Sequence, residues 1–412
     1  MRKLSAAVLF LSAISVSTAV SLPAQTRVQL GVDRLASAFP KVLEGKRVGL
    51  ITNHTGHNRG RTPTIDLLAA RKDMKLVALF APEHGIRGVA SGRIAFATDE
   101  KTGLPIHSLF GETQKPTPAM LENVEALVFD IQDVGVRQYT YISTLGLAMQ
   151  AAAEKKIPIV VLDRPDPIGG NIIEGNIRED GLQSFVGLYP IASRYGMTPG
   201  ELAGMYNKHW NVGADLHVVK VEGWKRDVWL DKTDLPWTGP SPNLPKFEGI
   251  VHYPGTVFFE GTNVSEGRGS DAPFEQVGAP WLRAQEVADS MNALKLPGVS
   301  FSARTYPILP TGRKFGGQTI NGVKLQVTDR NAYRPIATSM RLIAMIRKLH
   351  PADFQWRGSR TPEGKDNFSL DRLTGSTRIR AAIENGTLDA LLAEWDRDAE
   401  KFREMRKPYL LY

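Results

Sequence analysis

Short apolar runs alternate with helix-like segments over much of the first half of the chain. Each run has the length of a buried strand, and the runs cover residues 47–51, 76–80, 127–131 and 159–162. Helix-like spacing of apolar residues covers 64–71, 118–123 and 143–155, with Thr64 as the expected N-cap of the first helix. This alternation predicts a parallel, doubly wound sheet, so the predicted fold class is α/β.

Further elements follow in the second half of the chain. Thr198, Pro199 and Glu201 have the pattern of a capped helix start, and 216–221 has the pattern of a strand. The proline-rich segment 237–245 is too irregular for a helix or strand, and we interpret it as a shaped loop between two domains. The second domain is expected to begin near residue 249, with helices at 284–294, 336–348 and 383–402 and strands at 300–304 and 323–327.

Residues 1–24 have the pattern of a secretory signal peptide. Residues 2–3 are positively charged, 6–20 are apolar and small, and Ala19 or Ala24 would precede the cleavage site. This stretch is too short for a membrane span, and no later stretch reaches the roughly 20 apolar residues that a span requires. We therefore expect an exported bacterial protein, periplasmic or secreted.

Composition narrows the function classes. The 412 residues include no cysteine, which excludes disulfides, thiolate nucleophiles, cysteine-ligated zinc and lipid attachment after the leader. The net charge of +8 favours anionic partners such as cell-wall polymers or acidic sugars, although a basic soluble protein without such a partner fits equally well. The chain has no run of five like charges, so nucleic acid is not an expected partner. It also lacks a Gly-x-Gly-x-x-Gly turn and a Walker loop, and no cofactor is predicted.

Polar side chains follow three of the predicted strands at the point where each strand ends. The groups are Glu83, His84 and Arg87 after 76–80; Asp130, Asp133 and Arg137 at the end of 127–131; and Asp163 and Arg164 after 159–162. In an open α/β sheet, ligands bind just outside the carboxyl ends of the strands. The sequence therefore predicts a site at this edge of the sheet.

The segments that carry this chemistry form a series of motifs along nearly the whole mature chain. They are Gly-Leu-Ile-Thr-Asn-His-Thr-Gly (49–56), Pro-Glu-His-Gly-Ile-Arg-Gly (82–88), Asp-Ile-Gln-Asp-Val-Gly-Val-Arg-Gln-Tyr-Thr-Tyr (130–141), Asp-Arg-Pro-Asp-Pro-Ile-Gly-Gly (163–170), Pro-Ser-Pro-Asn-Leu-Pro (240–245) and Glu-Gly-Thr-Asn-Val-Ser-Glu-Gly-Arg-Gly (260–269). In these motifs the chain resembles the bacterial NamZ-type exo-β-N-acetylmuramidases. It departs at Asp166, where the family usually has Asn, and at Ser270, where it usually has Thr. Neither departure removes a candidate acid.

The resemblance implies an architecture and a substrate. It implies a Rossmann-like N-terminal domain, here 28–248, and a smaller α/β C-terminal domain, 249–412, with the site in the cleft between them. It also implies removal of N-acetylmuramic acid from the non-reducing end of peptidoglycan fragments, as part of cell-wall turnover. Composition and spacing alone would not indicate that substrate.

Glycoside hydrolysis usually needs two carboxyl groups, one on each side of the scissile bond. We assign Glu83 as the general acid/base, because a strand-end turn fixes it and the neighbouring His84 and Arg87 can tune its ionisation; a turn cap or an ion pair with an arginine is the alternative. Glu174 is the first candidate for the partner acid, and the resemblance also points to it. Glu260 and Glu266 are the other candidates. A 2-acetamido carbonyl can instead act as internal nucleophile, with Asp130, Asp133 or Asp163 orienting the amide.

Muramic acid differs from glucosamine by a lactyl carboxylate, which a guanidinium binds bidentately. Arg137 and Arg268 are the expected partners, with Arg87 and Arg164 as alternatives; a structural ion pair with an aspartate is the competing role for each. Tyr139, in preference to Tyr141, is expected to offer a ring to the sugar. The other predicted substrate contacts are Asn53, His54, His84, Asp130, Asp133, Asp163, Glu260, Asn263 and Glu266.

Two rival functions remain compatible with the sequence. The chain could be a muropeptide- or sugar-binding protein without catalysis, because two α/β domains around a cleft also describe solute receptors. It could also be a metal-dependent hydrolase, but His54, His57 and His84 match no zinc spacing such as His-Glu-x-x-His, and we predict no metal.

Overall fold

The structure is a computed structural model that describes residues 27–86, 97–360 and 366–412. The expected leader (1–24) and Arg87 lie outside these ranges.

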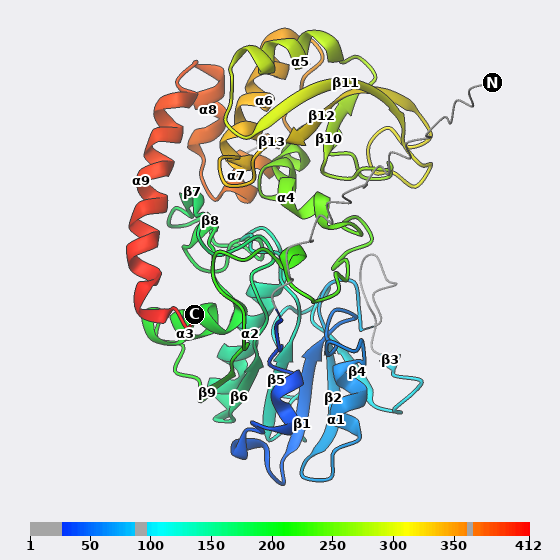
Figure 1. The fold of residues 1–412 in the computed structure, drawn as a ribbon, viewed down its shortest axis with the longest axis vertical. Helices are drawn as coiled ribbons and strands as arrows, with labels where there is room; N and C mark the ends of the chain where they lie inside the picture. The colour runs from blue at the N-terminus through cyan, green and yellow to red at the C-terminus, as the bar shows by residue number, and fades with distance from the viewer. Residues whose placement is uncertain (1–26, 87–96, 361–365) are drawn as a thin grey trace, which may run out of the picture.

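A seven-stranded sheet dominates the first half of the chain and lies in the lower part of Figure 1. In spatial order its strands are β3 (Ala97–Thr98), β4 (Pro105–Ser108), β2 (Lys75–Ala81), β1 (Arg47–Thr52), β5 (Ala126–Asp130), β6 (Ile159–Leu162) and β9 (Leu216–Val219). Neighbouring strands are parallel except for β3 against β4. The predicted parallel α/β sheet is therefore confirmed, apart from this short antiparallel edge strand.

The alternation of side chains along the strands explains why helices cover both faces of the sheet. Helices α1 (Thr64–Ala69), α2 (Tyr141–Lys155) and α3 (Pro199–His209) follow β1, β5 and β8 in the chain. Leu50 of β1 packs in one apolar cluster with Leu68 of α1, whereas the adjacent Ile51 packs in another cluster with Leu145 of α2. Successive residues of a strand point to opposite faces, so a central strand with apolar residues throughout needs cover on both sides.

The strand order defines where a ligand site is expected. The chain passes from β1 to β2 on one side, and later from β5 to β6 on the other. The carboxyl ends of β1 and β5, at Thr52 and Asp130, therefore flank the topological switch point, where loops diverge and leave a crevice.

Local signals were read correctly at one helix start and incorrectly at two other places. The Thr198 side chain accepts from the Glu201 amide while the Glu201 side chain accepts from the Thr198 amide, which confirms the predicted capping box of α3. Thr64 does not cap α1, because the helix begins at Thr64 itself and the Thr64 hydroxyl donates to Asp130. The helix predicted over 118–123 is wrong: this segment, which begins at Pro118, forms successive turns.

The second half of the chain contains a smaller antiparallel sheet and most of the remaining helices. The sheet has the order β10 (Gln276–Ala279), β12 (Thr319–Val327), β11 (Val299–Pro307), and α4 (Phe247–Thr256), α5 (Ala284–Ala293) and α6 (Pro335–Leu349) lie with it. The other elements are the pairs β7 (Glu174–Ile177) with β8 (Ala192–Arg194) and β13 (Gly358–Arg360) with β14 (Asp366–Phe368); α7 (Ser369–Thr374), α8 (Arg378–Glu384) and α9 (Leu388–Arg406); and the short 3-10 helices η1 (Asp33–Ala36), η2 (Lys41–Leu43), η3 (Leu230–Lys232), η4 (Val257–Gly261) and η5 (Lys407–Tyr409).

Helix α9 connects the two halves of the molecule. It runs down one side in Figure 1, from the upper part to the neighbourhood of α3, and packs against β7 on the way. At its end the buried Arg406 donates to the Tyr195 carbonyl at 3.2 Å. The proline-rich segment 237–245 is irregular, as predicted, and leads directly into α4.

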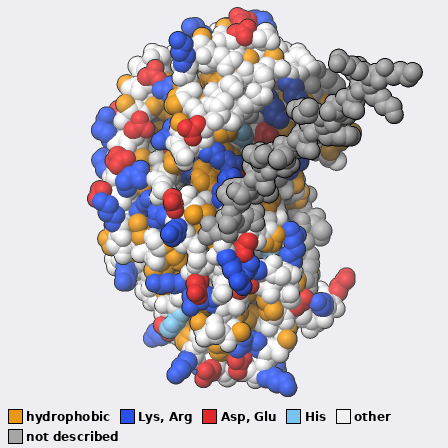
Figure 2. Space-filling model, in the orientation of Figure 1, with side chains coloured by type: hydrophobic (Ala, Val, Ile, Leu, Met, Phe, Trp, Pro, Cys, Tyr) orange, Lys and Arg blue, Asp and Glu red, His pale blue; other side chains and the backbone are white. Residues whose placement is uncertain are grey.

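Charged side chains are spread over the face drawn in Figure 2. Lys and Arg are interspersed with Asp and Glu over both halves, with hydrophobic patches between them. The net positive charge is therefore not concentrated in one patch on this face.

Candidate active site

A cavity of about 100 Å³ lies where loops of the large sheet meet the second half of the chain. Its lining residues are Glu83, His84, Gln138, Tyr139, Thr140, Ser241, Asn243, Leu244, Tyr253, Arg268, Phe274 and Arg313. They come from the turn after β2, the segment before α2, the proline-rich loop, α4, the Gly-rich segment 260–269 with its continuation, and the β11–β12 loop.

Glu83 enters this cavity from a sharp turn directly after β2. His84 and Gly85 both adopt φ of 73°, a left-handed conformation that is unfavourable for a non-glycine residue such as His84. Glu83 is half-buried, and the Thr140 hydroxyl donates to its Oε2 at 3.0 Å. The turn and this hydrogen bond hold one carboxylate in a fixed place at the cavity.

Aromatic rings form one wall of the cavity. Tyr139 makes edge-to-face contacts with Tyr141 (4.9 Å between ring centroids) and Tyr253 (5.6 Å), and Tyr253 contacts Phe274 at 4.9 Å. The Tyr141 hydroxyl donates to the Pro240 carbonyl at 2.8 Å, so Tyr141 supports the proline-rich loop while Tyr139 lines the cavity. Burial, followed by the neighbouring phenols, raises the pKa of Tyr139 well above its ordinary value. Tyr139 therefore offers a neutral ring to a ligand.

Arg268 forms the charged wall of the cavity together with two glutamates. Its Nη2 lies 2.7 Å from Glu260 Oε1, and its Nη1 lies 3.0 Å from Glu266 Oε1. Lys314 Nζ contacts the other oxygen of Glu266 at 2.9 Å. Burial raises the pKa of Glu266, but Lys314 and Arg268 outweigh it and hold this pKa below its ordinary range. The guanidinium also lies over the Phe274 ring, 4.9 Å from its centroid. The positive charge of Arg268 is therefore balanced by the two glutamates and by this ring.

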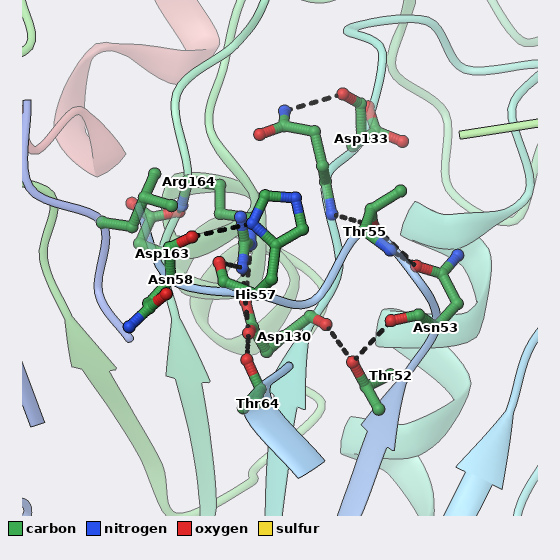
Figure 3. Close-up of polar contacts among 12 residues, drawn as sticks. Thr52, Asn53, Thr55, His57, Asn58, Thr64, Asp130, Asp133, Asp163 and Arg164 are labelled. Atoms are coloured by element: carbon green, nitrogen blue, oxygen red, sulfur yellow. Dashed lines mark hydrogen bonds and ion pairs between the residues drawn. The ribbon is translucent and has the colours of Figure 1, made fainter. Parts of the chain in front are cut away.

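Several residues predicted at the strand ends form a buried network instead (Figure 3). Arg164 Nε lies 2.5 Å from Asp130 Oδ1, its Nη2 lies 3.0 Å from Asp130 Oδ2, and the same Nη2 donates to the His57 carbonyl at 2.8 Å. Thr52 donates to the Asp130 carbonyl at 2.7 Å. Asp130 and Arg164 are almost fully buried and do not line the cavity, so they join β1, β5 and β6 rather than contact a ligand there.

Asp163 and the first-strand residues have similar supporting positions. Asp163 accepts from the Gly200 amide at 2.7 Å and from the Thr198 hydroxyl at 2.8 Å, at the start of α3. Burial raises its pKa to about 6 although the Tyr412 hydroxyl bonds to it and lowers the pKa. Asn53 Oδ1 accepts from the amide and hydroxyl of Thr55, and His54 Nε2 lies 2.8 Å from the Gly239 carbonyl. None of these residues lines the cavity.

Two predicted residues, Asp133 and Glu174, are buried acids that do not line the cavity. Asp133 Oδ2 accepts from the Gly135 amide at 2.7 Å and from the Tyr195 hydroxyl. Glu174 Oε1 accepts from the Ala337 amide at 2.8 Å, in the first turn of α6. Burial is the main cause that raises the pKa of each to about 7. The structure therefore does not bring Glu174 to Glu83 as a cavity-lining partner acid.

The position of Arg137 contradicts its predicted role. Only 1% of this residue is exposed, and its guanidinium donates to the carbonyls of Ile191 (2.6 Å), Thr374 (2.6 Å) and Asn176 (3.1 Å). These bonds use the donors that would grip a substrate carboxylate. Asn263 is also occupied, because its amide group bonds to the backbone of Asp353 and Gln355.

Sequence reasoning missed several residues of the cavity. They are Gln138, Thr140, Ser241, Asn243, Leu244, Tyr253, Phe274 and Arg313. A signal existed for the residues of the proline-rich loop and for Thr140, which lies inside a recognised motif. Tyr253 and Arg313 carried none, because an apolar helix and a Gly-rich turn give no indication of which cavity they meet.

Two further features concern metals and membranes. Within the described ranges, no group of three or more His, Asp or Glu side chains is placed to hold a metal ion. Among the same residues, no helix is both long and apolar enough to cross a bilayer.

These observations define a two-domain α/β protein with a polar and aromatic cavity beside the strand ends. The models for the N-terminal and C-terminal parts of "Exo-beta-N-acetylmuramidase NamZ" match residues 48–248 and 251–412. The chain therefore belongs to the NamZ family, as its motifs suggested.

Individual relatives agree with this membership. The chain is 47% identical over 389 residues to the "Peptidoglycan beta-N-acetylmuramidase NamZ" of Bacillus subtilis (strain 168), covering 94% of this chain and 92% of that protein. Two crystal structures of DUF1343 family proteins from Bacteroides fragilis have similar folds. The first has a TM-score of 0.86 at 38% identity and the second 0.75 at 31%; each match covers 94% of this chain and 100% or 99% of the other.

Proposed function

We propose that this protein is an exo-acting glycoside hydrolase that releases N-acetylmuramic acid from the non-reducing end of peptidoglycan fragments. The observation that carries the proposal is the 47% identity to a peptidoglycan β-N-acetylmuramidase over nearly the full length of both chains. The cavity supports it, since a held carboxylate, aromatic rings and polar side chains are the groups that bind and cleave a sugar.

Glu83 acts as the general acid/base in this proposal. It is the only carboxylate among the described residues that line the cavity, and Thr140 restricts its orientation. A held carboxylic acid protonates the leaving glycosidic oxygen and so contributes typically about 100- to 10,000-fold to the rate. Tyr139 and Tyr253 supply the apolar surface against which a sugar ring packs.

The second reacting group has two candidates after the structure is considered. Glu260 contacts the lining through its pair with Arg268 at 2.7 Å, and its side chain is 26% exposed, whereas the Glu266 side chain, which also contacts Arg268, is 3% exposed. The substrate's own acetamido carbonyl is the other candidate, since this route needs no second carboxylate at the reacting carbon. NMR of the sugar anomer that is released first tests this choice. Inversion of configuration at the anomeric carbon excludes the acetamido route, and retention is compatible with it.

The decisive assay compares a chromogenic β-N-acetylmuramide with its β-N-acetylglucosaminide, with and without a chelator. We expect release from the muramide alone and no effect of the chelator. Loss of activity with chelator and its return with zinc would support a metal-dependent hydrolase. No release from either substrate, together with calorimetric binding of muropeptides, would support a binding protein without catalysis.

The proposal includes a location and a domain division. Residues 1–24 act as a signal peptide, so the mature protein is periplasmic or secreted and meets peptidoglycan fragments there. The N-terminal domain spans 28–248 and the C-terminal domain 249–412. Fractionation of cells that express the full chain tests the location: a mature protein that stays in the cytoplasm contradicts it.

A further inference from the structure

Arg313 differs from Arg268, the other arginine that lines the cavity, because no described residue forms an ion pair with it. It lies in the β11–β12 loop, is exposed and lines the cavity. Within the described parts of the chain, it makes no hydrogen bond or ion pair with another residue. Arg268, by contrast, is held between Glu260 and Glu266.

Among the described residues that line the cavity, Arg313 and Glu83 are the charged side chains without an ion-pair partner. Arg268 and Lys314 carry two positive charges, which Glu260 and Glu266 balance with two negative ones. A fixed cation beside a cavity attracts an anionic group of the ligand, and a guanidinium binds a carboxylate through two parallel hydrogen bonds.

The loop that carries Arg313 is anchored on both sides. Lys314 Nζ donates to the carbonyls of Phe259 (2.8 Å) and Val264 (2.7 Å) in addition to its contact with Glu266. Before Arg313, the Leu309 amide donates to the Gly269 carbonyl at 2.7 Å. The backbone at Arg313 is therefore positioned before a ligand binds, which lowers the entropy lost on binding.

Close packing of two glycines adds to this anchoring. A Cβ placed on Gly269 would lie 3.3 Å from the Gly312 Cα, so the Gly-rich segment and the loop approach each other at backbone distance. Gly269 also has φ of 79°, which favours glycine. Gly269 therefore serves the same purpose as Lys314, because it lets the loop with Arg313 lie against the cavity wall.

We propose that Arg313 binds the lactyl carboxylate of the terminal N-acetylmuramic acid and so determines the selectivity of this enzyme. The proposal rests on the proposed function, since it names the residue that reads the acid group of that substrate. Three of the arginines expected from the sequence are less suitable: Arg137 and Arg164 are buried and already bond to carbonyls or to Asp130, and Arg268 is paired with two glutamates. The fourth, Arg87, lies outside the described residues.

The test is a double-mutant cycle between protein and substrate. Wild type and Arg313→Ala are compared on the chromogenic N-acetylmuramide and on the methyl ester of its lactyl group. We expect Arg313→Ala to raise KM for the acid about tenfold, the lower end for a hydrogen bond to a charged group because Arg313 is exposed. The ester should bind wild type and variant equally. The effects on KM of removing the arginine and of methylating the carboxylate should therefore not be additive.

Two more variants separate charge recognition from general damage. Arg313→Lys keeps the charge without the planar fork, so it should recover part of the KM. Arg347→Ala is the matched control: Arg347 is on α6, makes an ion pair with Glu384 at 3.6 Å and does not line the cavity. It should leave KM for acid and ester unchanged.

The outcomes distinguish this proposal from the proposed function. Equal changes of KM for acid and ester in Arg313→Ala, or no change for either, would overturn the role of Arg313 while leaving the glycosidase intact. If wild type hydrolyses neither compound, the proposed function fails, and calorimetry decides about Arg313 alone. In that case free N-acetylmuramic acid should still bind wild type about tenfold more tightly than Arg313→Ala; equal affinities would refute the proposal.

Discussion

Asp166 offers a quantitative test of how burial controls ionisation in this fold. It lies in the turn after β6 with 1% exposure, and its Oδ1 accepts from the Ile168 amide at 3.1 Å. Gly135 packs so closely that a Cβ there would lie 2.5 Å from this oxygen. Burial raises the pKa of Asp166 from 3.8 to about 7, although the Arg194 charge acts in the opposite direction. The folded protein therefore holds a proton that the unfolded chain releases.

The sign of the effect follows from this raised pKa. The folded state binds the proton more tightly, so the contribution of Asp166 to stability is complete below pH 3.8 and is lost as pH rises through about 7. With these two pKa values, proton binding stabilises the fold by about 2 kcal/mol at about pH 5.5 and by almost nothing at about pH 8.5. The side chain of Asp166→Asn is neutral at both pH values. The free energy of unfolding of this variant should therefore not show the loss of about 2 kcal/mol that wild type shows between these pH values.

The assay is urea unfolding of wild type and Asp166→Asn at about pH 5.5 and about pH 8.5, followed by circular dichroism. The free energy of unfolding of the variant, relative to wild type, should rise by about 2 kcal/mol between the lower and the higher pH. Asp130→Asn is the control, because it removes one side of the buried ion pair with Arg164 and should destabilise the protein at both pH values. If wild type and Asp166→Asn lose the same free energy with rising pH, the reasoning is refuted.

Three other predictions follow from the site. Glu83→Gln should keep the fold and lower kcat on the muramide by at least about 100-fold, because it removes the proposed acid; a rate near that of wild type would exclude Glu83. Thr140→Val removes one hydrogen bond to Glu83 and should lower kcat only about 2- to 10-fold; a loss as large as that of Glu83→Gln would contradict a supporting role. Arg137→Met removes a donor from three buried carbonyls, of which only Thr374 keeps another side-chain donor, Asn176 Nδ2, and it should destabilise the protein by about 3–5 kcal/mol in urea. Selectivity for the lactyl acid over its ester should stay unchanged in the folded enzyme; a selective loss for the acid would restore its predicted role.

Much of the fold could be predicted because its signals are local. The runs at 47–51 and 159–162 each contain enough apolar residues to require cover on both faces, and the structure gives them central positions. The cap of α3 depends on three positions close in sequence, so it could be recognised without tertiary information. The helix expected at 118–123 is replaced by successive turns, because apolar spacing over six residues is too short a signal to distinguish a helix from turns.

The site was harder to predict because its residues meet across long distances in the chain. The motifs correctly indicated that Glu83 and Tyr139 lie at one cavity, but they also contain charged residues that pair with each other. Asp130 and Arg164 form a buried ion pair with each other, and no sequence pattern distinguishes such a pair from two residues that contact a ligand. Arg313 was missed for the opposite reason: it belongs to none of the motifs, and only the meeting of its loop with the Gly-rich segment places it at the cavity.

The anchoring of Arg137 has a consequence for how the chain folds. Its guanidinium joins the segment before α2 to the Thr374 carbonyl, a contact between residues 237 positions apart. Arg406 makes a similar contact with Tyr195, 211 positions away. Closing such large loops is entropically unfavourable and slows folding. The cavity, with lining residues from 83 to 313, therefore forms only when distant parts of the chain have come together, so hydrolytic activity depends on these long-range contacts as well as on the sheet.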